Sequence, residues 1–230
     1  MGKFLAIAAA ALFALPAVAQ APAERKPEPK AAPKPETSIA VDSPRALKLL
    51  KGVEEYINAM KSISGSFVQR SSNGANDSGT FYISKPGRMR LEYKSPILLV
   101  ADGASIVYQD KKLDQISYMS LDSNPASIIL KGDVRLTGAK PSAVVRGISE
   151  SGGTAEIALA LPNAKDAGSL TLLFSARPLS LEGWRVRDPQ GITTDVSLLE
   201  IRESASFDSS LFKITRNRTI GGSKNSGKYY

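Results

Sequence analysis

The sequence predicts a mainly β protein in which one large, curled antiparallel sheet is covered by two helices. Short segments of β-branched and alternating residues recur along most of the 230-residue chain, separated by Gly, Pro, Asn and Asp turn signals. Only residues 44–60 and 125–131 show apolar residues grouped as in helices. Evenly spaced strands joined by short turns are typical of a single antiparallel sheet.

Residues 79–103 show the strand pattern most clearly. Residues 89–93 alternate apolar and charged side chains, which predicts a half-buried strand because successive side chains of a strand point to opposite faces. The β-rich runs 80–84 and 97–100 lie on either side, and residues 85–87 (Lys-Pro-Gly) supply the turn of the first hairpin. We therefore expect three adjacent strands whose apolar face includes Met89, Leu91 and Tyr93.

A helix is predicted from residue 44, because Ser43 can cap the free amides and Pro44 suits the first turn. Charged residues lie away from its apolar stripe. The stripe is that of an ordinary core-facing helix, or of a helix that packs loosely over the sheet as a lid. Its apolar residues recur every three or four positions, at Leu47, Leu50, Val53, Ile57 and Met60.

A second, shorter helix is predicted after Asn124-Pro125, and Gly132 ends it. Its last turn is entirely apolar, which is unusual for an exposed helix, and contains Ile128, Ile129 and Leu130. Residues 71–78 are predicted as a loop. Outside the central stretch, the predicted strands are 64–70, 105–110, 115–121, 143–149, 154–161, 169–176, 179–187, 193–201 and 207–215.

The two ends of the chain differ in composition from the part between them. Residues 1–19 have the features of a secretory signal, with Lys3, a short apolar run and small residues up to Ala19, near which cleavage is expected. Residues 20–42 are rich in Pro, Ala, Lys and Glu, and we predict a disordered linker that is a passive spacer or a partner-binding arm. Residues 215–230 are predicted as a basic disordered tail, which leaves 43–214 as the folded domain.

The composition excludes several kinds of function. The chain has no Cys and no His, which excludes thiol nucleophiles, Ser-His-Asp triads and the commonest zinc ligands. It also lacks a phosphate-binding glycine loop and a nucleophile elbow. The net charge is +8, but five basic residues lie among the last eighteen, so no nucleic-acid surface is expected. An enzyme would have to use carboxylates, Lys, Tyr or Ser, and no cofactor is expected.

The apolar residues suggest a cavity instead. A curved sheet with sparse helical cover leaves an apolar space between the sheet and the helices, and such a space suits an aliphatic ligand. The alternative is that the helices fill this space and leave no cavity. The residue pattern by itself leaves both possibilities open.

Several short motifs stand in an order and at a spacing that are specific when taken together. They are GSFVQ (65–69), GTFYI (79–83), KPGRMR (85–90), EY (92–93) and LVxDG (99–103). With the short apolar helix and the later strands, they resemble the LolA family, the periplasmic carriers of outer-membrane lipoproteins. The resemblance covers about residues 43–214.

This resemblance implies an unclosed (half) β-barrel whose concave face is covered by the two helices and whose cavity receives the acyl chains of a lipoprotein. In the family, a basic hairpin residue helps to hold the helical lid shut, and it maps to Lys85, where lysine replaces the usual arginine. Two aromatic positions map to Met89 and Leu91. Acyl-chain contacts are expected from Leu47, Leu50, Met89, Leu91, Tyr93, Ile128 and Ile129.

The resemblance also implies a carrier that is not an enzyme: a soluble periplasmic monomer whose cargo is acylated lipoproteins. It would receive them from an inner-membrane LolCDE-type ABC transporter and pass them to an outer-membrane LolB-type acceptor where one exists. An envelope sensor or a carrier of another lipid with the same fold is the alternative. Charging the cavity, as in Leu91→Glu, is expected to abolish carriage while leaving the fold.

Overall fold

The computed structural model describes residues 37–162 and 168–214, and its main feature is a single sheet of twelve strands. All neighbouring strands pair antiparallel. In chain order the strands are β1 (Thr37–Ile39), β2 (Ser62–Ser71), β3 (Asn76–Ser84), β4 (Arg88–Tyr93), β5 (Ile97–Asp102), β6 (Ser105–Asp110), β7 (Gln115–Ser120), β8 (Val144–Ser151), β9 (Thr154–Ala160), β10 (Ser169–Ala176), β11 (Leu179–Arg187) and β12 (Thr193–Glu203).

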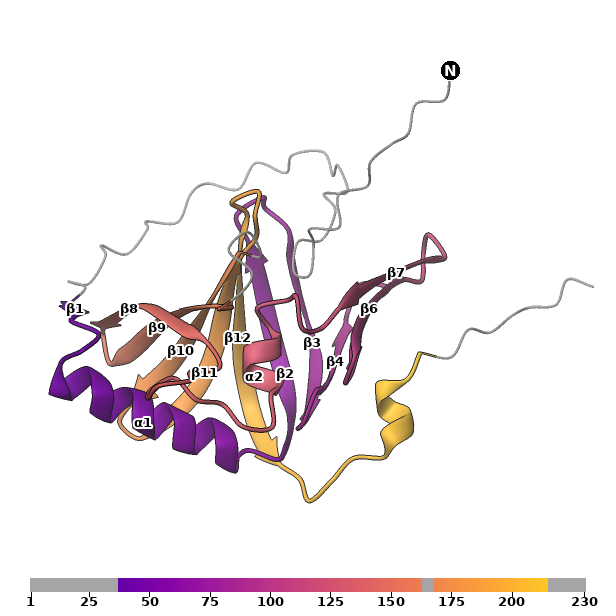
Figure 1. Ribbon diagram of the computed structural model, residues 1–230. Coiled ribbons are helices and arrows are strands. Elements are labelled where there is room, and N and C mark those ends of the chain that lie inside the picture. The colour runs from indigo at the N-terminus through magenta and orange to yellow at the C-terminus, as the bar shows by residue number, and fades with distance from the viewer. Residues whose placement is uncertain (1–36, 163–167, 215–230) are drawn as a thin grey trace, which may run out of the picture.

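The order of strands leaves the sheet unclosed. Strands β2–β7 and β8–β12 are two meanders, joined where β12 pairs with β2. Strand β1 adds to β8, so β1 and β7 are the two edges of the sheet (Figure 1). The prediction of one large antiparallel sheet in an unclosed barrel, with an N-terminal helix and a short second helix, is confirmed.

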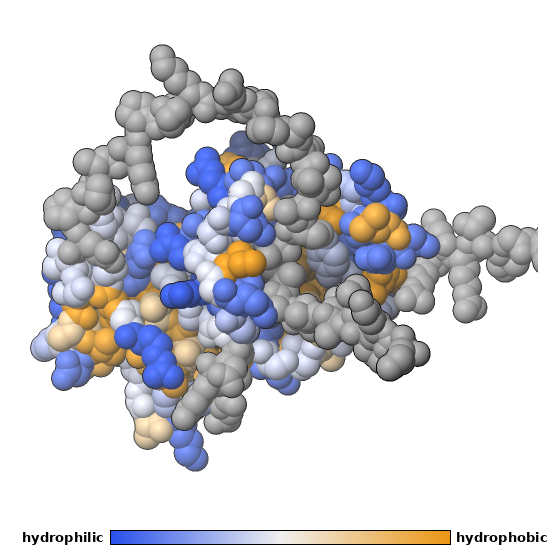
Figure 2. All heavy atoms as spheres, turned by 90° about the horizontal axis from the view of Figure 1, so that it is seen from above, coloured by the Kyte–Doolittle hydropathy of each residue, from blue (hydrophilic) through white to orange (hydrophobic). Residues whose placement is uncertain are grey.

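Side-chain alternation separates a concave apolar face from an outer face that is largely polar. On β4, Met89 and Leu91 are buried in the main core, whereas Arg90 on the opposite face donates to the carbonyl of Leu211. Seen from above, polar residues cover much of the centre, and apolar residues reach the surface in separate patches, the largest of them at the left (Figure 2).

Helix α1 (Pro44–Ala59) lies across the sheet near β11, and α2 (Ser127–Leu130) lies in front of the central strands (Figure 1). The predicted cap is present, because the Ser43 hydroxyl accepts from the amide of Ala46 at 3.2 Å. The buried stripe differs from the predicted one at its first position. Ala46 is buried and Leu47 is 48% exposed, because Leu47 lies one step around the helix from the core side.

The prediction of a last strand at residues 207–215 is wrong. The chain forms a single 3₁₀ turn, η1 (Ser209–Phe212), because the Asp208 carboxylate caps it by accepting from the amide of Ser210 at 2.8 Å. Phe212 then packs on the outer face against Leu98 and Val100. The C-terminal segment therefore covers the outer face of β4 and β5 and adds no strand to the sheet.

Two other differences from the prediction concern the linker and the loop 71–78, whereas several other strand ends differ by one or two residues. Residues 37–39 fall in the predicted linker but form β1, because their backbone groups pair with β8. The predicted loop 71–78 is shorter, since β3 already begins at Asn76 and pairs there with Arg70. The predicted signal, the remainder of the linker (20–36) and the tail (215–230) lie outside the described residues.

Candidate functional site

Five of the seven residues predicted to contact acyl chains lie in one apolar interior between the helices and the concave face. Tyr93 packs against the same cluster. Leu91 and Ile128 are 0% exposed, so neither touches a space that admits a water molecule. The interior is therefore closed around these side chains. The five buried residues are Leu50 from α1, Met89 and Leu91 from β4, and Ile128 and Ile129 from α2.

Leu47 does not belong to this interior. It points away from the core, as described above, and its neighbour Ala46 occupies the buried position. The sheet side of the interior is built from cross-strand pairs, in which Phe81 of β3 stands opposite Leu91 and Leu91 stands opposite Leu99 of β5. These three side chains are buried and carry no polar atom, so the surface beneath the helices is hydrocarbon.

Polar contacts join helix α1 to the loop that follows α2. The amide nitrogen of the Asn58 side chain donates to the carbonyl of Val134 at 2.9 Å, and the amide of Val134 donates to Asn58 Oδ1 at 2.8 Å. The carboxylate of Glu54 accepts from the amides of Leu136 and Thr137, the latter at 2.7 Å. We call α1, α2 and residues 131–142 the lid, because these contacts connect them as one unit over the sheet.

The sequence analysis missed Glu54 and Asn58. Glu54 is one of several charged residues away from the apolar stripe, and nothing local distinguishes it from a solvated side chain. Its partners lie 82 and 83 residues further along the chain, and the partner of Asn58 lies 76 residues away. Only the tertiary structure brings these groups together.

The β3–β4 hairpin fastens both helices of the lid to the sheet. Lys85 Nζ donates to the carbonyl of Ile57 in α1 at 2.7 Å, and the amide of Gly87 donates to the carbonyl of Leu130 in α2 at 2.7 Å. Ile57 lies in the last turn of α1, where carbonyls lack helical partners and a cation is favoured. The residue predicted to lock the lid is thus in direct contact with it.

Burial lowers the pKa of Lys85 from 10.5 to about 8, and Asp133 nearby only partly opposes this effect. The half-buried ammonium therefore loses part of its hydration when the lid is closed. Between pH 8 and 10.5 the unfolded chain, with an ordinary lysine, binds more protons at this residue than the folded chain does. Stability therefore rises with pH across this window, and below pH 8 the contribution of Lys85 is constant.

We expect the free energy of unfolding of the native chain to rise between pH 8 and pH 10 relative to that of Lys85→Met. Chemical denaturation at several pH values measures this difference. Tyr93 and Tyr108 act in the opposite direction, because burial raises the pKa of each, but only above about pH 10, where unfolded tyrosine ionises. Lys48→Met, on the exposed side of α1, is the control and should follow the native profile.

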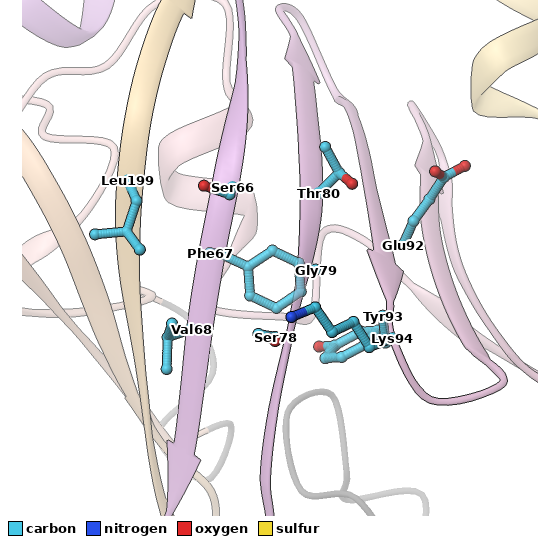
Figure 3. A pocket seen from close by; sticks show the side chains of 10 residues that line it. All are labelled: Ser66, Phe67, Val68, Ser78, Gly79, Thr80, Glu92, Tyr93, Lys94 and Leu199. Carbon is cyan, nitrogen blue, oxygen red and sulfur yellow. The ribbon is translucent and has the colours of Figure 1, made fainter.

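Two pockets bounded by described residues lie on the outer face of the sheet, away from the lid. One, of about 520 Å³, has Ser66, Thr80 and Leu199 in its wall (Figure 3). The other, of about 650 Å³, lies between the segment around η1 and strands β4–β7, and includes Phe212 and Tyr118. The first pocket also includes Tyr93, but neither pocket includes the five buried residues predicted to contact acyl chains.

The described residues contain no cluster of three His, Cys, Asp or Glu side chains suited to a metal ion. Among them there is also no helix with the length and apolar character needed to span a membrane.

A family model and curated relatives indicate the same family. The family model "Outer membrane lipoprotein carrier protein LolA" matches residues 58–215. Two relatives named "Outer-membrane lipoprotein carrier protein" are similar over most of their length. The protein of Cupriavidus necator is 27% identical over 191 residues, covering 77% of this chain and 88% of its own. That of Neisseria meningitidis serogroup C is 27% identical over 187 residues, covering 77% and 86%.

Among solved structures, the LolA superfamily protein NE2245 from Nitrosomonas europaea aligns with 72% of this chain and 97% of its own, at 7% identity and a TM-score of 0.42. The family model covers more than half of the chain, and its match includes strands β2–β12, the short helix α2 and the hairpin of Lys85. The chain therefore belongs to the LolA family of outer-membrane lipoprotein carriers, which are transport proteins and not enzymes.

Proposed function

We propose that this protein is a periplasmic carrier that shelters the acyl chains of lipoproteins in the interior beneath its lid. The observation that carries the proposal is the closed apolar interior. Its lid is fastened to the sheet by the Lys85 and Gly87 hydrogen bonds, and its side chains include five of the seven residues predicted to contact acyl chains. Such an interior needs no catalytic residue, cofactor or metal.

The free energy of transfer requires that the acyl chains stay out of water, but it does not require a high-affinity site. Each methylene transferred from water is worth about 0.8 kcal/mol, so several acyl chains exposed to water would cost tens of kcal/mol. The cargo starts and ends in a membrane, where its methylenes are already out of water. The carrier therefore needs only a comparably apolar interior from which the chains can leave again.

Loading requires the lid to move, because the five interior residues are buried and Leu91 and Ile128 are 0% exposed when it is closed. Opening breaks the hydrogen bonds of Lys85 with α1 and of Gly87 with α2, each worth about 1 kcal/mol net. The apolar side chains of the lid then lose their contacts with the sheet and with one another, and gain contacts with the acyl chains. Lysine at residue 85 makes a single hydrogen bond where arginine could make two, which favours a lid that opens readily.

The direction of transport is part of the proposal. Lipoproteins would come from an inner-membrane LolCDE-type ABC transporter and pass to a LolB-type outer-membrane acceptor. The names of the relatives support outer-membrane lipoproteins as cargo. The apolar interior by itself also suits another lipid, and mass spectrometry of molecules that co-purify with the periplasmic protein separates the two: phospholipid without lipoprotein favours the second.

A crosslink between lid and sheet tests whether opening is needed. A Cβ at Gly52 of α1 would lie 3.1 Å from the Leu179 side chain of β11, and the chain has no native cysteine to interfere. We expect Gly52→Cys/Leu179→Cys, joined by a short reducible crosslinker, to lose release of lipoproteins from inner-membrane vesicles. Reduction should restore release.

The matched control is Ser66→Cys/Thr80→Cys, which joins the paired strands β2 and β3 on the outer face and leaves the lid free. It should release lipoproteins with or without the crosslink. Normal release by the crosslinked lid variant would show that acyl chains are held elsewhere, and the proposal would then be wrong.

A further inference from the structure

The concave face is not apolar over its whole length, because polar side chains gather at one end. Gln69 on β2, Tyr93 on β4 and Tyr108 on β6 define this end, which we call the tyrosine end. Tyr108 shares the inner face of β6 with Ile106, a residue of the main core, because the two are two positions apart. Lys85 lies beyond the opposite end of β4.

These three residues lie close together although they come from three different strands. Phe67 pairs with Gly79, which pairs with Tyr93, so Gln69 lies near the Tyr93 ring. The Tyr93 hydroxyl donates to Gln69 Oε1 at 2.8 Å, and Gln69 is 0% exposed. Tyr108 pairs with Leu99, the partner of Leu91, and is close enough to Tyr93 to help raise the pKa of that phenol.

The Tyr108 hydroxyl is the group at the tyrosine end that lacks a hydrogen-bond partner and could bind a ligand. Its oxygen is buried, and among the described residues it has no hydrogen-bond partner. A buried donor without an acceptor is unfavourable and is rare in folded proteins. The nearby Tyr93 hydroxyl donates to Gln69 and is not a hydrogen-bond partner of Tyr108.

The charges around the tyrosine end indicate which acceptor it takes. Burial raises the pKa of both phenols, and Asp110 beside Tyr108 and Asp77 beside Tyr93 raise it further, so each phenol has a carboxylate nearby. Asp110 Oδ1 accepts hydrogen bonds from the amides of Lys112 and Leu113. A ligand carboxylate or phosphate placed here would meet two negative charges, whereas a neutral carbonyl oxygen would accept from Tyr108 without repulsion.

We propose that the tyrosine end is a subsite for the neutral carbonyl group that links an acyl chain to the head of the cargo, with Tyr108 as donor. The inference rests on the proposed function, because it assumes that acyl chains occupy the interior. The carbonyl is the first polar atom above an acyl chain. Because Tyr108 stands beside Leu99 in the sheet, its hydroxyl is within reach of the carbonyl of a chain that lies against Leu91 and Leu99. A glyceryl ester and an N-terminal amide offer the same acceptor.

Synthetic lipopeptides with equal chain lengths test the subsite. The first has two ester-linked chains. The second has the same chains ether-linked, and the third adds an amide-linked chain to the ether form. Binding to the full mature protein is measured by displacement of a fluorescent acyl probe. In Tyr108→Phe we expect a loss of about three- to tenfold for the ester form or for the amide form, and no change for the ether form.

The pattern of losses identifies the source of the carbonyl, ester or amide. Tyr118→Phe on the outer face, where Tyr118 is 62% exposed, is the control and should bind all three as the native chain does. Because the readout is a ratio between ligands on one protein, a change in stability cannot imitate it. Thermal denaturation should show Tyr108→Phe no less stable than the native chain, since an unpaired buried hydroxyl is removed.

If Tyr108→Phe binds each of the three lipopeptides as tightly as the native protein does, the subsite proposal is wrong and the carrier function is unaffected. Equal losses for all three would also overturn it, because the hydroxyl would then not distinguish a carbonyl. Failure of the native protein to bind any of them would overturn the proposed function together with the subsite.

Discussion

Gly79→Ala is expected to lower the free energy of unfolding by about 3 kcal/mol, because the new methyl group has no space. Its Cβ would lie 1.9 Å from the carbonyl oxygen of Glu92 on β4 and 2.9 Å from the Phe67 ring on β2. Backbone cannot give way here without separating β3 from β4. Figure 3 shows the Phe67 ring lying beside Gly79.

The same glycine lets two aromatic rings meet. Phe67 and Tyr93 pair with Gly79 from either side, and their ring centroids lie 5.0 Å apart in an edge-to-face arrangement. A methyl group between them would also disturb this contact, which is worth about 0.5–1.5 kcal/mol beyond its buried area. The substitution is thus expected to disturb the packing of Tyr93 at the tyrosine end as well as the pairing of the strands.

Thermal and urea denaturation measure the effect, and we expect the Tm to fall by about 10 °C. Gly147→Ala is the matched control, since no atom lies within 4 Å of its added Cβ, and its stability should change by less than about 0.5 kcal/mol. A Gly79→Ala protein as stable as Gly147→Ala would mean that β3 and β4 do not approach as described.

Leu91→Glu is expected to cost about 4 kcal/mol at pH 7 from the ionisation of the new carboxylate alone. Leu91 is 0% exposed between Phe81 and Leu99, so the carboxyl group would have no water and no partner. Burial raises the pKa of such a group, and the native state must hold it neutral at a cost of 1.36 kcal/mol per pH unit above about 4.3. The burial thus changes the sequence-based expectation that this variant keeps its fold.

The pH dependence identifies the cause. A carboxyl group with a raised pKa in the folded state destabilises more as pH rises above its unfolded value, so the ionisation cost should fall to about 1 kcal/mol at pH 5. Urea denaturation at both pH values, read against Leu91→Met, measures it. Leu91→Met keeps the volume and should lose less than about 1.5 kcal/mol at either pH. A cost of Leu91→Glu that is independent of pH would contradict burial of the charged group.

The predicted elements show where local pattern is sufficient. Residues 169–176 and 179–187 are strands with the predicted boundaries, because alternation and turn residues are short-range signals. For residues 207–215 the same short-range pattern predicted a strand that does not form. Their apolar residues satisfy a strand pattern, but Asp208 caps a 3₁₀ turn and Phe212 packs on the outer face.

The site was predicted in part for a similar reason. Met89 and Leu91 share a strand face, so period two placed them correctly in the interior. Leu47 was wrongly included in the buried stripe because helical spacing fixes the side of a helix only to within about one residue, and the small Ala46 takes the core side.

The sequence by itself determined the class of fold, the apolar face of the central meander, the two covering helices and the family resemblance, because each depends on neighbouring residues or on motif order. Only the tertiary structure decided that the interior is closed, that Glu54 and Asn58 join the lid, and that the Tyr108 hydroxyl is buried without a partner. These features depend on contacts between residues far apart in the chain, and local periodicity carries no information about such contacts.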